Sequence, residues 1–93
     1  MTEERFASVW DAIAETPAEA EKMKLRAKLM TALRDHIKAQ SWTQAKAAQR
    51  LGTTQPRVSD VMRGKISLFG IEALVTLLSA AGLTVDVEVR RAA

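Results

Sequence analysis

The feature that most constrains the fold is a pair of short helical segments separated by a tight glycine turn. Thr43 can cap a first segment, Gln44–Leu51, because its hydroxyl can accept a hydrogen bond from the free backbone N–H groups of the first helical turn. Gly52 ends that segment, as glycine does where the chain must turn through positive φ. Thr54 then caps a second segment, from residue 55 to about residue 63. The sequence therefore predicts two short helices joined by a three-residue turn.

Small and apolar residues lie where these two helices would meet. Ala48 is small where the helices must approach closely, and three apolar residues lie where the second helix would pack on the first: Leu51, Val58 and Val61. The first turn of the second helix presents three side chains outward: Gln55, Pro56 and Arg57. A unit of this kind places its second helix in the major groove of DNA, led by its N-terminal residues. Because glutamine can form two hydrogen bonds with adenine, Gln55 is the first candidate for base recognition.

The charges are distributed unevenly along the 93 residues, whose net charge is +3. Residues 1–21 contain six acidic residues and one basic residue, whereas residues 46–65 contain five basic residues and one acidic residue. A basic segment suits the phosphate backbone of DNA, and an acidic arm suits a different contact. An ordinary helical hairpin is the alternative, but the caps, the turn, the packing and the charge all agree with DNA binding.

Three further helices are expected around this unit. The first lies near the N-terminus and carries one apolar stripe, formed by Phe6, Val9, Trp10 and Ile13. That stripe either packs on the protein's own core or binds a partner protein. A long helix from Pro17 to about residue 40 follows, capped by Thr16, with Glu19 completing a capping box. The last helix begins at Ser67 or a near neighbour and ends at Gly82.

The hydrophobic period changes after residue 82. Apolar residues now alternate with polar ones, which is typical of a strand: Leu83, Val85, Val87 and Val89. A lone strand cannot satisfy its own backbone groups. The segment is therefore a frayed tail, an edge against its own domain, or a strand paired with a second copy of the chain. We favour pairing with a second copy, which makes these four residues the expected dimer interface.

The motif resembles the helix-turn-helix of the xenobiotic-response-element (XRE), or lambda-repressor-like, family of regulators. The agreement covers the Thr-Gln pairs that open both helices, the small Ala48, the Leu-Gly turn, Val58-Ser59 and the Arg-Gly-Lys ending at residues 63–65, while Thr53 departs from the apolar residue usual in the turn. The resemblance implies that three residues face base edges: Gln55, Pro56 and Asp60. It implies that six residues contact phosphates: Gln44, Thr54, Arg57, Ser59, Arg63 and Lys65. A base contact is the alternative for Arg57.

The layout of the whole chain is similar to that of small antitoxins of the HigA type. The implied fold is all-α, a lambda-repressor-like bundle of about five helices plus one short C-terminal β-strand used for dimerisation. Its expected parts are an acidic amphipathic N-terminal arm (residues 1–16), the helix-turn-helix DNA-binding domain (residues 17–82), and a C-terminal strand and tail (residues 83–93).

The resemblance implies a sequence-specific transcriptional repressor that binds a palindromic operator as a homodimer. Like a HigA-type antitoxin, it would repress its own operon and neutralise a RelE-like (HigB-like) ribonuclease toxin. One alternative is a phage-type or stand-alone repressor without a toxin partner. Another, of a different class, is a protein-binding adaptor with a vestigial DNA site.

Several function classes are disfavoured by the composition. The chain has no cysteine and a single histidine, His36, so one chain cannot build a multi-histidine or thiolate metal site. It also lacks a recognisable combination of nucleophile, base and metal ligands, so we expect no enzyme activity and no cofactor. No apolar run approaches the ~18 residues of a membrane span, and we expect a cytoplasmic, nucleoid-associated protein without membrane contact.

Overall fold

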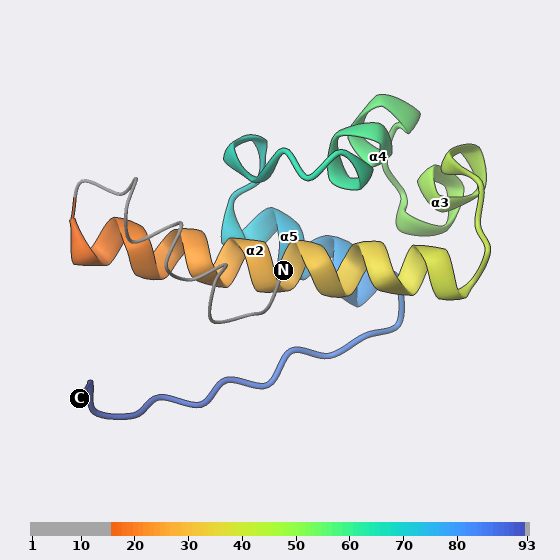
Figure 1. Ribbon diagram of the computed structural model, residues 1–93. Coiled ribbons are helices and arrows are strands. Elements are labelled where there is room, and N and C mark those ends of the chain that lie inside the picture. Colours follow the sequence, from red (N-terminus) through yellow and green to blue (C-terminus); the bar gives the residue numbers. More distant parts are fainter. Residues whose placement is uncertain (1–15, 93) are drawn as a thin grey trace.

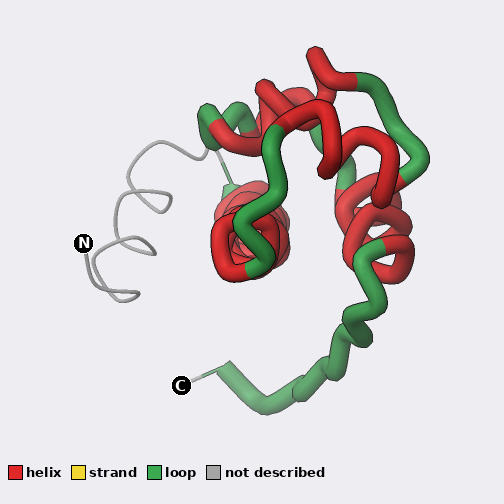
Figure 2. Tube along the Cα trace, turned by 90° about the vertical axis from the view of Figure 1, so that its right-hand side faces the viewer, coloured by secondary structure: helices red, strands yellow, loops and turns green. Residues whose placement is uncertain are grey.

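A computed structural model describes residues 16–92, which form four α-helices and one short 3-10 helix. In chain order they are α2 (Pro17–Ala39), α3 (Gln44–Leu51), α4 (Gln55–Met62), η1 (Ile66–Leu68) and α5 (Ile71–Ala80). Figure 1 shows α2 running along the molecule, with α5 beside it and with α3 and α4 above its C-terminal half. The C-terminal residues lie on the opposite side of α2 from α3 and α4 (Figures 1 and 2).

The long helix α2 begins where the capping box predicts. The Thr16 hydroxyl accepts a hydrogen bond from the backbone N–H of Glu19 at 3.1 Å, and Pro17 occupies the first turn. One face of the helix is buried, through Ala20, Ala27, Leu29, Met30, Leu33 and Ile37. This face packs chiefly on α5, so α2 and α5 together form the base on which the two short helices rest.

The hydrophobic core joins the short helices to this base. Its largest fully buried side chains come from α2, α4, α5 and the connection before α5: Phe69, Met30, Leu33, Ile37, Leu74, Val58 and Val61. Because Val58 and Val61 belong to α4, the same core that stabilises the fold also fixes the orientation of that helix.

The last helix begins later than the sequence suggests. Ser67 does not cap it: residues Ile66–Leu68 form η1, and α5 starts at Ile71 after Gly70. Phe69 explains the difference, because its backbone is extended (φ −128°, ψ 121°) while its side chain is buried in the core. An extended residue cannot continue a helix, so burial of this ring separates η1 from α5.

The expected bundle of about five helices is not confirmed, since residues 16–92 contain four α-helices. The first expected helix, with Phe6, Val9, Trp10 and Ile13, lies outside the described residues, so these four side chains stay a sequence-based prediction.

The prediction of a C-terminal β-strand is wrong for the described chain. Residues 83–92 form no strand, because this part of the molecule offers no second strand with which they could pair. The expected apolar face also divides in two: Leu83 and Val85 pack against the core, whereas Val87 and Val89 are 76% and 89% exposed. The segment instead leaves α5 as an irregular extended chain (Figures 1 and 2).

The end of α5 itself follows the prediction. Gly82 has φ +83°, and the backbone N–H of Leu83 donates to the carbonyl of Leu78 at 3.0 Å, which is the Schellman ending expected from the glycine. None of the helices in residues 16–92 is both long and apolar enough to cross a membrane.

Candidate nucleic-acid interface

The two short helices begin and end at the residues that the sequence indicates. The Thr43 hydroxyl accepts from the backbone N–H of Lys46 at 3.1 Å, and the Thr54 hydroxyl accepts from that of Arg57 at 3.3 Å. Gly52 adopts the left-handed conformation (φ 65°, ψ 34°), so the chain reverses between α3 and α4 without strain. The local chemistry of caps and glycine therefore builds a helix-turn-helix.

The contact between α3 and α4 is apolar and close. Ala48, Leu51, Val58 and Val61 are all buried, as expected. Ala47, which the sequence analysis did not single out, is fully buried as well. Two adjacent alanines let the backbones of α3 and its neighbours approach closely. The Ala47-Ala48 pair was the signal in the sequence that could have indicated the burial of both.

The first turn of α4 is open to solvent. Gln55 and Pro56, both expected to face bases, are exposed, and Asp60 one turn later is half-buried. Of the residues expected to contact phosphate, Gln44, Thr54, Arg63 and Lys65 are exposed, while Arg57 and Ser59 are half-buried. The fold thus gathers all nine on α3, α4 and the two turns that follow α3 and α4.

Two of these nine residues are paired with each other. The Asp60 carboxylate lies 3.6 Å from the Lys65 ammonium, and the Asp60 carbonyl accepts from the Lys65 backbone N–H at 3.1 Å. The resemblance implies a base contact for Asp60 and a phosphate contact for Lys65, and nothing in the sequence indicates that the two pair with each other. The carboxylate partly neutralises the ammonium, so Lys65 attracts an anionic surface less strongly while the ion pair is intact.

Arg57 lies differently from the other basic residues. Its guanidinium donates to the carbonyl of Leu68 at 3.2 Å and lies 4.1 Å from the centre of the Phe69 ring. Both partners follow more than ten residues later in the chain. Such a tertiary contact leaves no trace in helix caps or hydrophobic periodicity, so it could not be predicted from the sequence.

Trp42 connects α2 to α3. It is half-buried against the core, its ring meets that of His36 edge-on at 5.5 Å between centroids, and the guanidinium of Arg50 lies 6.0 Å from the ring. These contacts hold the residue that precedes the α3 cap against the end of α2.

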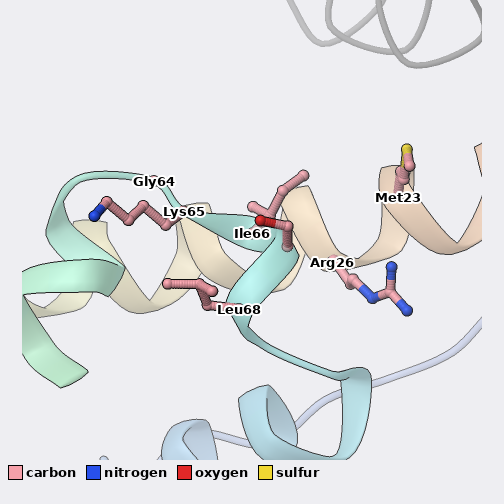
Figure 3. A pocket seen from close by; sticks show the side chains of 7 residues that line it. Met23, Arg26, Gly64, Lys65, Ile66 and Leu68 are labelled. Carbon is pink, nitrogen blue, oxygen red and sulfur yellow. The ribbon is translucent and has the colours of Figure 1, made fainter. Parts of the chain in front are cut away.

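A groove lies between α2 and the chain that leaves α4. It is lined by Met23, Arg26, Gly64, Lys65, Ile66, Ser67 and Leu68. Figure 3 shows the Lys65 ammonium directed toward α4 and away from Arg26, so the two cations do not converge on one point. Among the described residues there is no cluster of three histidine, aspartate or glutamate side chains that could hold a metal ion.

Comparison with known proteins agrees with this arrangement. The profile of a family described as a helix-turn-helix domain matches residues 12–90, a range that contains all four described α-helices. A solved structure assigned to the XRE family of transcriptional regulators is 36% identical and superposes with a TM-score of 0.73, over 80% of this chain and 83% of that chain. No curated protein sequence matches the chain.

Proposed function

Because the chain belongs to the XRE family of helix-turn-helix transcriptional regulators, we propose that it is a sequence-specific repressor that inserts α4 into the major groove of operator DNA. The observation that carries this proposal is the exposed first turn of α4, held rigidly by a threonine cap and a buried apolar face. Five basic residues lie between positions 46 and 65, on α3, on α4 and in the turn that follows α4. A rigid, exposed helix N-terminus in a basic surface is the arrangement that DNA reading requires.

Base readout is assigned to the exposed face of α4. Gln55 offers an amide that can both donate to and accept from adenine, and Pro56 offers an apolar surface for a thymine methyl group. Asp60 can accept from the amino group of cytosine, provided that Lys65 releases part of its hold on the carboxylate.

Phosphate contacts are assigned to the edges of the same unit. Gln44 at the start of α3 and Thr54 at the start of α4 lie at helix N-termini, where backbone N–H groups favour an anion. Arg63 and Lys65 follow the C-terminal end of α4, and Ser59 lies between the two groups. These contacts would orient the protein on the duplex without selecting its sequence.

We further propose that the repressor is a homodimer on a palindromic operator. One helix-turn-helix reads few base pairs, and a two-fold dimer presents two copies of α4 to half-sites about one helical turn apart. The exposed valines 87 and 89 support an interface at the C-terminal segment, because apolar side chains at these exposures gain from being covered. Leu83 and Val85 would contribute at its edge, since both are already packed on their own core.

An antitoxin role is the finer form of the proposal. The support is the layout of the chain, above all the acidic arm with the apolar stripe of Phe6, Val9, Trp10 and Ile13. In this form the stripe binds a RelE-like ribonuclease toxin, and the protein represses the operon that encodes both. The test is a neighbouring gene for a small basic protein that copurifies with this chain. Loss of copurification when Trp10 and Ile13 become serine would support the antitoxin role over a stand-alone repressor.

The central experiment is selection of double-stranded DNA from a random pool by the full-length protein. We expect enrichment of a palindrome whose half-sites lie about 10 base pairs apart, or a multiple of that spacing. Fluorescence anisotropy should then show at least about a thousandfold preference for that palindrome over random DNA. Retention of random DNA without enrichment, or no retention, would contradict the proposal and leave an adaptor with a vestigial DNA site.

A further inference from the structure

Arg57 lies on the first turn of α4, but its side chain binds the protein's own interior. We propose that Arg57 is a positioning residue, which clamps the reading turn of α4 to the η1–α5 connection, and that it is not one of the residues that neutralise phosphate. This inference rests on the proposed function, because it concerns how α4 is presented to DNA. It replaces the phosphate contact that the sequence assigned to Arg57.

The contacts occupy both chemical features of the guanidinium. One terminal nitrogen donates to the Leu68 carbonyl at 3.2 Å, and the central guanidinium carbon, Cζ, lies 4.1 Å from the centre of the Phe69 ring. That distance is well inside the ~6 Å at which a cation is attracted by an aromatic face. A guanidinium can lay its planar face on a ring while its fixed N–H groups donate sideways, whereas the ammonium of lysine is a compact charge without such a face.

The partners are themselves held by packing and backbone hydrogen bonds. Phe69 is 1% exposed and is among the largest fully buried side chains of the core. The backbone N–H of Phe69 donates to the carbonyl of Ile66 at 3.2 Å, and that of Leu68 donates to Lys65 at 3.1 Å, so η1 holds the Leu68 carbonyl in place. Arg57 is therefore tied to a buried aromatic ring and to a carbonyl of a hydrogen-bonded turn.

The position of Arg57 explains why such a clamp would matter for reading. α4 has eight residues, and a helix this short is not stable alone. Its buried residues Val58 and Val61 fix its middle, while Gln55 and Pro56 lie before them in the exposed first turn. The Thr54 cap holds the backbone of that turn. Arg57 connects the same turn to the carbonyl of Leu68, in the segment that precedes α5. Loss of the clamp would let the first turn of α4 change its orientation. The preference for the palindrome over random DNA would then fall.

The test compares variants of the full-length protein on the selected palindrome and on random DNA, over a range of salt concentrations. Arg57→Lys keeps the charge and removes the planar contacts. Arg63→Ala is the matched control, because Arg63 is exposed at the other end of α4. Phe69→Leu removes the aromatic face while keeping an apolar side chain in the core. Circular dichroism and thermal unfolding restrict the comparison to temperatures at which each variant is folded.

We expect Arg57→Lys to weaken binding to the palindrome by about tenfold, the combined scale of one cation–π contact and one hydrogen bond, and to leave random DNA nearly unchanged. The slope of log K against log salt should stay as in the wild type. Arg63→Ala should instead weaken both DNAs and flatten that slope by about 0.9, the value for one phosphate. Arg57→Lys combined with Phe69→Leu should be little worse than the stronger single variant, because both changes disrupt one contact.

Two results would overturn the clamp. One is an Arg57→Lys protein that binds the palindrome and random DNA as the wild type does, because the planar contacts would then not contribute to reading. The other is strict additivity of the Arg57 and Phe69 variants. Either result leaves the wild type selective, so the proposed repressor function survives it. A wild-type protein that selects no DNA sequence would overturn the proposed repressor function. It would also overturn the role of the clamp in base reading.

Discussion

At the residue scale, the assignment most directly open to test is the amide of Gln55. It is exposed in the first turn of α4, where a bidentate pair with adenine would form. Gln55→Ala should weaken the selected palindrome by ~1–3 kcal/mol per pair lost and relax the preference at one base pair in each half-site. Anisotropy with single-base variants of the palindrome measures this. An equal loss on palindrome and random DNA would mean that Gln55 touches only the DNA backbone.

Asp60 offers a second prediction at this scale, with the opposite sign. Its carboxylate lies 3.6 Å from the Lys65 ammonium and would lie near phosphate in the complex. Asp60→Asn removes that negative charge and releases Lys65, so random DNA should bind several-fold tighter and the selectivity should fall. The salt slope should steepen by up to about 0.9, and Lys65→Ala added to the variant should reverse the gain. Unchanged binding of random DNA would show that the ion pair does not limit access to phosphate.

At the scale of elements, the caps show how much of this fold is local chemistry. Three threonines placed the starts of α2, α3 and α4 correctly, because a hydroxyl and the N–H three residues later are enough to fix a helix start. The start of α5 could not be found in this way, because burial of Phe69 in the core decides it. The strand predicted after residue 82 is absent from the described residues for a related reason. Alternation of apolar and polar residues predicts a strand, but a strand exists only where a partner strand lies beside it.

The caps also supply a prediction with an internal control. Thr43→Ala and Thr54→Ala each remove one capping hydrogen bond, so each should lower the free energy of unfolding by about 1 kcal/mol, while serine at either position should restore most of it. Thr54→Ala should in addition weaken operator binding, because it loosens the turn that carries Gln55. Denaturant unfolding followed by anisotropy separates the two effects. If both variants bind equally well, order in the first turn of α4 does not contribute to recognition.

At the scale of the whole molecule, the prediction concerns assembly. Truncation after Gly82 removes the exposed Val87 and Val89 together with Leu83 and Val85, which pack on the core, and leaves every residue of α2–α5 in place. It should turn a dimer into a monomer that keeps its helical circular dichroism and binds a single half-site weakly. Sedimentation velocity at micromolar concentration is the direct measurement. A full-length monomer would refute dimerisation through this segment, and a dimer that survives truncation would place the interface elsewhere.

The positions of the C-terminal segment and of α4 on opposite sides of α2 have an evolutionary consequence (Figures 1 and 2). Gln55 and Pro56 can change without any change at Val87 or Val89, since the two pairs lie on separate segments and all four side chains are exposed. A duplicated copy of this gene could therefore acquire a new target sequence in a few steps while retaining its old mode of assembly, or exchange its partner while retaining its target. Target sequence and mode of assembly would then diverge independently within one small domain.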